Sequence, residues 1–382
     1  MTKKMRIYDK GEKGKTKKKP KSNVKPAKPK VKTKKKEEGI GGSNNESTSQ
    51  DEVKHEGKIP ELKDLEKDVL KYIVGQDEQV RKIITAIYRA LAFPTIKSNV
   101  LIIGNSGTGK TATIKQIAQT LDIPCTIEDA TKYTQEGYYG ADVSDMIFNL
   151  IESANDDIAK AWNGIIVIDE IDKKANSGDQ HDVAGVEVLK SLLKIIEGTT
   201  VMVPPPDYMG ELIPFDTHNL IIIFMGAFPG LERIRDLRLN RNSMGFAHTE
   251  VKQEGSKKYL KQDLVKYGLP EEFVGRIDTI VEMNNLGQRE LAKILKQSKL
   301  SIFKRYEKEL KRLGISLEYD EELFEIIAKA SLAVDTGARE LSNTVNQVFE
   351  HIVYEVLANP DKYTKCKLLP GIVEDNTRFE LL

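Results

Sequence analysis

The stretch Gly104-Asn105-Ser106-Gly107-Thr108-Gly109-Lys110-Thr111 decides the fold of this chain. It follows the apolar stretch 99–103, which has the pattern of a buried strand, and it precedes residues 111–121, which have the pattern of a helix. Its glycines let backbone N–H groups turn toward a phosphate, and the helix dipole adds positive potential there. The alternative is an ordinary glycine-rich turn, which the Lys-Thr pair at a strand-to-helix junction argues against. The spacing therefore predicts a site for a nucleoside triphosphate.

The chemistry of phosphoryl transfer assigns roles within this loop. Lys110 is expected to reach the β- and γ-phosphates, and the Thr111 hydroxyl to complete the shell of a Mg²⁺ ion. We therefore predict ATP and Mg²⁺ as cofactors. The predicted phosphate-binding residues are Gly104, Asn105, Ser106, Gly107, Thr108, Gly109, Lys110, Thr111 and Ala112.

A second motif lies downstream, where the β-branched residues 165–168 run into Asp169 and Glu170. Such a run is typical of a buried parallel strand whose carboxyl end carries the two acids, and open α/β sheets bind ligands at that edge. Asp169 is expected to hold the magnesium and Glu170 to polarise the attacking water. Strands that end in Asp-Glu are common by chance, so this motif indicates an ATP site only because a phosphate loop lies upstream of it.

Composition bounds the architecture and the compartment. The 382 residues, of which 39% are hydrophobic, allow two or three domains with sizeable cores. There is no run of about 20 apolar residues and no apolar segment of a signal peptide at the N-terminus, so we expect a cytoplasmic protein without a membrane partner. The two cysteines, Cys125 and Cys366, are too few for a disulfide framework or a four-thiolate zinc site. We expect both to be core residues, and no zinc to be bound.

Charge is distributed unevenly along the chain. Residues 1–36 hold 17 basic and two acidic side chains, whereas the remainder holds 42 basic and 56 acidic ones. Residues 1–57 are rich in Lys, Pro, Gly, Ser and Asn, a composition that predicts a disordered basic tail. The tail could bind nucleic acid or another polyanion, or it could remain solvated against the acidic body, and composition alone favours neither.

From residue 58 onward, strand and helix patterns alternate, which predicts an α/β fold with a five-stranded parallel sheet. The expected strands are 100–103, 125–128, 165–168, 220–224 and 279–281, and the expected first helices are 62–72 and 77–92. Residues 58–283 would form this large domain. Residues 284–382 would form a small, mainly helical α+β domain, with one helix over 289–313 that ends at Gly314, a strand at 315–319, and helices at 320–332 and 338–357.

Five short motifs give the chain a specific resemblance. In order, they are Gly137-Tyr138-Tyr139-Gly140, Ile195-Ile196-Glu197-Gly198-Thr199, Gly226-Ala227-Phe228, Pro270-Glu271-Glu272-Phe273-Val274-Gly275-Arg276 and Thr336-Gly337-Ala338-Arg339. Over residues 65–375 the chain resembles the ClpX family of AAA+ protein unfoldases. The resemblance implies an AAA+ P-loop NTPase fold, a homo-hexameric ring, client polypeptides as substrates and a ClpP-like peptidase as a partner.

The resemblance also implies roles for residues outside the phosphate loop. Arg276 matches the family's arginine finger, which enters a neighbouring subunit's nucleotide site, and together with Lys110 and Glu170 it would form the catalytic set. Arg339 matches the arginine that touches the nucleotide from the small domain. Residues Ile73, Val74 and Gly75 match the segment that encloses adenine.

Two further segments match loops with mechanical roles. Tyr138 and Tyr139 correspond to the axial pore loop, where an exposed aromatic ring grips polypeptides without reading their sequence. Met244, Gly245 and Phe246 correspond to the peptidase-docking loop, in which Met replaces the usual Ile and has a similar volume.

The chain departs from the family in three respects. The lysine tail stands where the family has a zinc-binding N-terminal domain, the segment 204–217 lacks the family's Arg-Lys-His loop, and Met stands in the docking loop where the family has Ile. The strand 220–224 runs into Met225-Gly226 rather than a polar side chain, so no sensor residue is assigned there. Two other functions stay open: a nucleic-acid motor, which would explain the tail, and a scaffold without hydrolysis. The first predicts basic rather than aromatic pore residues, and the second predicts a damaged ATP site.

Overall fold

The structure is a computed structural model that describes residues 60–93, 95–133, 143–175, 183–205, 210–242, 257–333 and 338–382. The described residues all belong to one structural unit, which spans residues 57–382. Within the described ranges, no helix combines the length and the apolar character that crossing a membrane would need.

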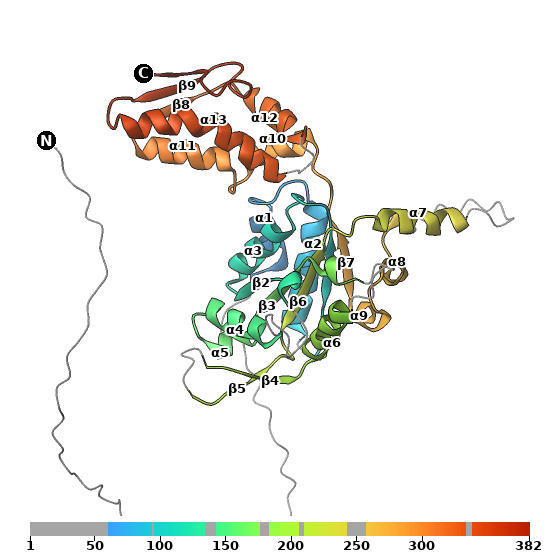
Figure 1. Ribbon diagram of the computed structural model, residues 1–382. Helices are drawn as coiled ribbons and strands as arrows, with labels where there is room; N and C mark the ends of the chain where they lie inside the picture. The colour runs from blue at the N-terminus through green and yellow to red at the C-terminus, as the bar shows by residue number, and fades with distance from the viewer. Residues whose placement is uncertain are drawn as a thin grey trace, which may run out of the picture. The chain divides into compact units, whose positions relative to one another are not determined.

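A five-stranded parallel sheet forms the centre of the first domain (Figure 1). Its strand order is β2-β3-β6-β1-β7, and the bounds are β1 Val100–Ile103, β2 Cys125–Asp129, β3 Ile165–Asp169, β6 Ile221–Gly226 and β7 Thr279–Glu282. Every residue of β1 and β6 is buried, as the near-continuous aliphatic runs predict for strands covered on both faces. The predicted fold class and the five predicted strands are confirmed.

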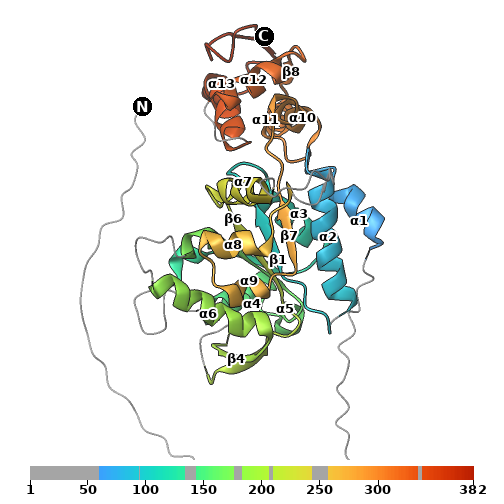
Figure 2. The same cartoon turned by 90° about the vertical axis from the view of Figure 1, so that its right-hand side faces the viewer.

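Helices cover both faces of the sheet, and alternate residues of β1, β3 and β6 divide between two hydrophobic clusters. Figures 1 and 2 show α1 (Leu62–Val69), α2 (Asp77–Ala92) and α3 (Lys110–Leu121) over one face. The other face is covered by α4 (Val143–Ser153), α6 (Val183–Glu197) and α9 (Glu271–Gly275). Val100 and Ile102 pack toward the first group, whereas Leu101 and Ile103 pack toward the second, because side chains alternate across a strand.

Smaller elements complete this domain. The hairpin of β4 (Thr200–Val203) and β5 (Ile213–Asp216) was not predicted from the sequence. A short helix α5 (Ile158–Ala161) follows α4, and α7 (Leu231–Asn242) and α8 (Lys261–Tyr267) follow β6.

The C-terminal domain is α+β, as predicted. It contains α10 (Gln288–Gln297), α11 (Ile302–Arg312), β8 (Ser316–Glu318), α12 (Leu323–Leu332), α13 (Ala338–Ala358), β9 (Lys365–Leu368) and β10 (Phe379–Leu381). Phe303 lies at the centre of its core, in edge-to-face contact with Tyr319, Phe324 and Phe349 at centroid distances of 4.9 to 5.3 Å. Strand β9 lies between β8 and β10 in a three-stranded sheet, and β9 and β10 were not predicted.

The single helix predicted over residues 289–313 is wrong, because two serines divide it into α10 and α11. The Ser298 hydroxyl donates to the Tyr72 carbonyl at 2.5 Å and accepts the Leu300 N–H at 3.0 Å. Ser301 caps α11 by accepting the Lys304 N–H at 3.3 Å. These side chains offer the backbone partners that compete with a continuous helix. Gly314 follows Leu313, the C-cap residue of α11, and has φ +78°, as a helix-ending glycine should.

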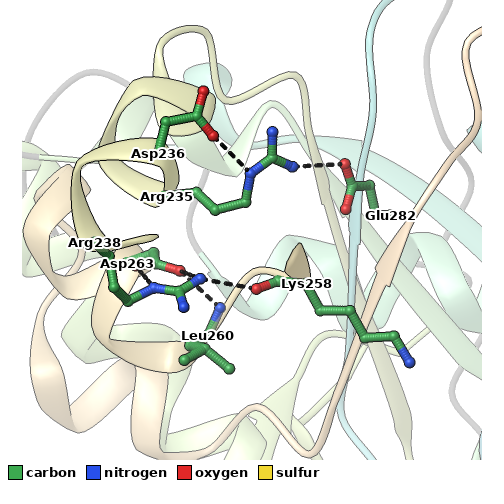
Figure 3. A network of polar contacts seen from close by, with 7 residues as sticks. All are labelled: Arg235, Asp236, Arg238, Lys258, Leu260, Asp263 and Glu282. Carbon is green, nitrogen blue, oxygen red and sulfur yellow. Dashed lines mark hydrogen bonds and ion pairs between the residues drawn. The ribbon is translucent and has the colours of Figure 1, made fainter. Parts of the chain in front are cut away.

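A buried ion pair joins α7 to α8 (Figure 3). The Arg238 guanidinium donates to both oxygens of Asp263 at 2.9 and 3.0 Å and to the Lys258 carbonyl at 3.0 Å. Asp263 also accepts the Leu260 N–H at 2.9 Å, at the start of α8. The two side chains are only 8% and 0% exposed, so each depends on the other to compensate for lost hydration.

We expect Arg238→Met to lower the free energy of unfolding by about 3 to 5 kcal/mol, because it leaves the Asp263 carboxylate buried without its main partner. Urea unfolding followed by circular dichroism measures the change. Arg312→Met is the matched control, since Arg312 pairs with Glu309 while the two side chains are 62% and 59% exposed, and an exposed pair contributes about 0 to 1 kcal/mol. Equal unfolding midpoints for the two variants would contradict this account of the α7–α8 contact.

Candidate nucleotide-binding site

The carboxyl ends of the central strands bring the predicted site residues to one edge of the sheet. Strand β1 runs into Gly104, whose N–H donates to the Gly226 carbonyl at the end of β6 at 3.2 Å. On the other side of β1, the Met283 N–H donates to the Ile103 carbonyl at 2.7 Å. The phosphate loop therefore begins between the ends of β6 and β7.

The phosphate loop has the backbone that its glycines predict. Gly107 and Gly109 adopt φ values of +79° and +91°, and Gly109 occupies the N-cap position of α3. A Cβ at Gly104 would come within 2.8 Å of the Met283 side chain, so this position needs glycine for a close approach. The Thr108 hydroxyl closes the turn by donating to the Asn105 carbonyl at 2.9 Å. Helix α3 thus points the open N–H groups of its first turn at the loop, which suits a phosphate.

Lys110 is bonded to the backbone of the phosphate loop and is influenced by three charged side chains. Its ammonium donates to the carbonyls of Gly104 and Asn105, the latter at 3.1 Å. Burial lowers the pKa of Lys110, the carboxylates of Asp169 and Asp172 act in the opposite direction, and the Arg339 guanidinium lowers this pKa further. These interactions place two carboxylates and a second cation in the electrostatic environment of the lysine.

Asp169 and Glu170 lie where the sequence predicts them, at the end of β3. Asp169 is the last residue of the strand, and its carboxylate accepts the Glu170 N–H at 2.9 Å. Glu170 is exposed and has a φ of +57°, a left-handed conformation that is uncommon for residues other than glycine. Such backbone conformations cost about 1 to 3 kcal/mol and concentrate at functional sites. Asp169 therefore ends the strand and is half-buried, whereas Glu170 begins the following turn and is exposed.

Asp172 is a site residue that the sequence analysis missed. Its side chain is buried and accepts the Phe228 N–H at 3.3 Å, which ties the turn after Glu170 to the segment after β6. Gly226 makes this contact possible, because a Cβ there would lie 2.6 Å from Asp172 Oδ1 and 2.6 Å from the Phe228 ring. The pattern Asp169-x-x-Asp172 was the available signal. Met225 is fully buried in the core, and β6 ends without a polar side chain at positions 225 and 226.

The segment predicted to enclose adenine lies against the start of the C-terminal domain. Ile73 is 7% exposed and belongs to the core beneath α1 and α2, whereas Val74 and Gly75 are half-buried. Gly75 has φ +79°, and a Cβ on it would come within 3.1 Å of Glu290 and 3.2 Å of Leu286. Gly75 therefore lies against residues at the start of the C-terminal domain, whereas Ile73 packs in the core of the first domain.

Gln76 connects this segment to the phosphate loop and was also missed by the sequence analysis. Its buried amide donates to the Thr108 carbonyl at 3.0 Å and to the Asn284 carbonyl at 2.8 Å, and it accepts the Asn284 N–H at 2.9 Å. The Asn284 side chain in turn donates to the Gly75 carbonyl at 3.0 Å and pairs with Gln79 at 2.9 Å. A polar residue directly after the Ile-Val-Gly turn was the only signal in the sequence.

The structure brings Arg339 close to the phosphate loop. Helix α13 begins at Ala338, whose N–H donates to the Gly107 carbonyl at 3.3 Å. Arg339 is the next residue, and its charge acts on Lys110. The N-terminus of α13 therefore meets the loop predicted to bind phosphate.

Arg276 lies apart from these residues. It follows α9 and precedes β7, and its carbonyl accepts the side-chain amide of Asn99, the residue directly before β1. Arg276 is consequently at the amino end of the sheet, whereas the phosphate loop is at the carboxyl end. The five residue steps from Asn99 to Gly104, which include β1, span about 16 Å at about 3.3 Å per residue. The predicted pore residues Tyr138 and Tyr139 and the predicted docking residues Met244, Gly245 and Phe246 lie outside the described residues.

The residues at the carboxyl edge fit a nucleoside triphosphate with Mg²⁺. The loop supplies glycines where the backbone turns, a cation in Lys110 and a hydroxyl in Thr111, and β3 supplies a carboxylate in Asp169. This donor set consists of hard oxygen ligands, which Mg²⁺ prefers, together with positive charge for phosphate.

Comparisons with known proteins agree with this geometry. Residues 96–280 match the family described as AAA domain (Cdc48 subfamily), and residues 286–365 match the family described as the C-terminal, D2-small domain of ClpB protein. Three similar curated proteins are each named ATP-dependent Clp protease ATP-binding subunit ClpX. The protein from Borrelia duttonii (strain Ly) is 37% identical over 321 residues, which cover 78% of this chain and 75% of the relative.

The other two relatives give the same result. The protein from Treponema denticola is 35% identical over 330 residues, covering 79% of each chain. The protein from Bacteroides thetaiotaomicron is 33% identical over 335 residues, covering 81% of this chain and 80% of the relative. Since these ClpX relatives are 33 to 37% identical to the chain and are covered over 75 to 80% of their own length, the chain belongs to the ClpX family, with an AAA ATPase domain and the small domain that follows it.

Proposed function

We propose that this protein is an ATP-dependent unfoldase that works as a homo-hexameric ring and pulls client polypeptides through a central pore. The observation that carries the proposal is the placement of the two arginines. Arg339 lies beside the chain's own phosphate loop, whereas Arg276 lies at the opposite end of β1. A nucleotide that Arg276 contacts must therefore belong to another subunit, and a closed ring gives every subunit such a neighbour.

Each residue at the carboxyl edge has a distinct task in this proposal. ATP supplies the transferable phosphoryl group, and Lys110 and the backbone of residues 104–109 hold its phosphates. Thr111 and Asp169 hold the magnesium. Glu170 is exposed at the site, so its carboxylate can orient and polarise a water, while Asp172 keeps the turn beneath it in place through Phe228. Arg276 from the neighbour stabilises charge that develops on the transferred group.

The contacts between the two domains explain how hydrolysis would produce motion. Ala338 bonds the phosphate loop from one side, and Gln76 bonds both that loop and Asn284. A change in the loop therefore acts on the segment that joins the domains, which we place at residues 58–283 and 284–382. Rotation of one domain against the other would then move Tyr138 and Tyr139 along the pore.

The relatives' names support a peptidase as partner, since each is called a subunit of an ATP-dependent Clp protease. We propose that Met244, Gly245 and Phe246 dock on a ClpP-like ring. For the lysine-rich residues 1–57 we propose contact with a polyanion, nucleic acid included, because 17 of the first 36 residues are basic.

Glu170→Gln is expected to bind ATP and to reduce its turnover about 10²- to 10⁴-fold, because the amide cannot act as the general base. Steady-state ATPase assays and binding of a fluorescent ATP analogue measure the two effects. Glu152→Gln, on an exposed residue of α4, is the control and should hydrolyse ATP normally. Fast turnover by Glu170→Gln would overturn its assigned role.

The same variant, held in ATP, should retain partly threaded proteins that mass spectrometry can identify. Recovery of proteins together with a ClpP-like ring supports the unfoldase. Recovery of nucleic acid alone would instead favour a motor that acts on nucleic acid.

Arg276→Ala is expected to lower the rate of ATP hydrolysis about 10³- to 10⁵-fold, as loss of an arginine finger does in other phosphoryl-transfer enzymes. Mixing Arg276→Ala subunits with Glu170→Gln subunits should restore hydrolysis. In a mixed ring, the Glu170→Gln subunit supplies an intact Arg276 to the ATP site of its Arg276→Ala neighbour, which still has Glu170. Arg289→Ala, at an exposed arginine in α10, serves as the control. Mixed rings that stay inactive would contradict a site shared between subunits.

Tyr138→Ala is expected to keep ATP hydrolysis and lose unfolding of a stable substrate, because the ring that grips the polypeptide is gone. Tyr138→Phe keeps the aromatic ring and should retain most of the unfolding activity. Loss of fluorescence from a folded fluorescent protein follows the reaction. Unfolding at the wild-type rate by Tyr138→Ala would remove the pore assignment.

A further inference from the structure

Asn99 is a buried polar residue at the end of β1 that lies away from the phosphate loop. It is only 4% exposed, and its Nδ2 donates to the Arg276 carbonyl at 2.9 Å. A buried amide keeps such a position when it satisfies a specific partner, because a buried polar group without one is costly. Here the partner is the backbone of Arg276 itself.

The backbone of Asn99 is bound to the same segment. Its N–H donates to the Asp278 carboxylate at 2.8 Å, and its carbonyl accepts the N–H groups of Asp278 at 2.9 Å and Thr279 at 3.2 Å. The side chain and the main chain of one residue therefore attach residues 276–279 to the start of β1. Of these contacts, only the one from the side chain reaches Arg276, so it is the one that a substitution can remove.

The guanidinium of Arg276 has a separate partner. Its Nη2 lies 2.5 Å from the Glu197 carboxylate, at the end of α6, with the two side chains 50% and 44% exposed. An exposed pair holds its members weakly and can exchange partners. The guanidinium is thus free to leave Glu197 for a stronger anion, while the backbone beneath it stays fixed by Asn99.

We propose that Asn99 is a positioning residue for Arg276, and that it sets where the arginine is presented to the neighbouring subunit. This inference rests on the proposed function, in which Arg276 completes the neighbour's ATP site. The phosphate loop follows the other end of the same strand. Strand β1 therefore acts as a rigid spacer between the nucleotide that a subunit binds and the Arg276 that it presents to its neighbour. Catalysis is sensitive to such placement, since a shift of about 1 Å can cost about 10²-fold in rate.

Asn99→Asp is the test, because it keeps the shape of the side chain, removes the N–H donor and turns a carboxylate toward the Arg276 carbonyl. We expect kcat for ATP hydrolysis to fall about 10- to 100-fold with little change in KM for ATP. Asn99→Ala removes the donor without adding charge and should lower kcat in the same way, which keeps the test available if the first variant folds poorly. An unchanged kcat in the folded variants would overturn the proposal.

A mixing experiment separates positioning from general damage. Mixed with Glu170→Gln, the Asn99→Asp subunit should regain turnover, because its own ATP site is intact and the added subunit provides a well-placed Arg276. Ser98→Ala is the matched control: Ser98 is also 4% exposed, but it accepts from Arg89 at 2.8 Å rather than serving Arg276, and its kcat should stay near wild type.

The outcomes distinguish the positioning role of Asn99 from the shared site. Rescue of both Arg276→Ala and Asn99→Asp by Glu170→Gln supports the positioning role. Rescue of Arg276→Ala alone would overturn that role, because the damage at Asn99 would then lie within its own subunit. Failure to rescue Arg276→Ala would overturn the shared site itself, and the positioning role with it.

Discussion

The parallel pairing of β1 with β6 and β7 is the constraint on which the other features depend. Val100 is in register with Ile223 on one side and with Thr279 on the other. Because all three strands run in the same direction, their carboxyl ends deliver Gly104, Gly226 and Met283 to one edge, and the residues that precede them gather at the opposite edge. The phosphate loop and Arg276 are separated for this reason, and the separation supports the proposal that Arg276 acts in a neighbouring subunit's site.

Buried polar contacts connect the two domains around the phosphate loop. Gln76 satisfies three backbone groups at once, one in the loop and two at Asn284, and it is almost completely buried. A network of this kind holds its partners in a defined arrangement, because leaving any buried member without a partner is costly. These contacts connect the phosphate loop to the segment between the domains, as the proposed coupling of hydrolysis to motion requires.

Much of the fold followed from patterns that are local in the sequence. Short aliphatic runs marked the five central strands, and the glycine spacing marked the phosphate loop. The helix predicted over residues 289–313 failed because Ser298 and Ser301 bond the backbone, one of them to the distant Tyr72 carbonyl. Strands β9 and β10 escaped prediction because short strands depend on partners that local pattern does not reveal.

The sequence by itself determined the chemistry of the site: which residues are suited to phosphate and metal, which acid follows the strand, and which family the motifs resemble. These follow from residue types at fixed spacing. The tertiary structure alone decided how distant residues combine. Asp172 meets Phe228, Gln76 meets Asn284, and Asn99 meets Arg276 across separations of 56 to 208 residues. No spacing rule encodes such contacts, because they exist only once the strands have paired and the core has excluded water from these groups.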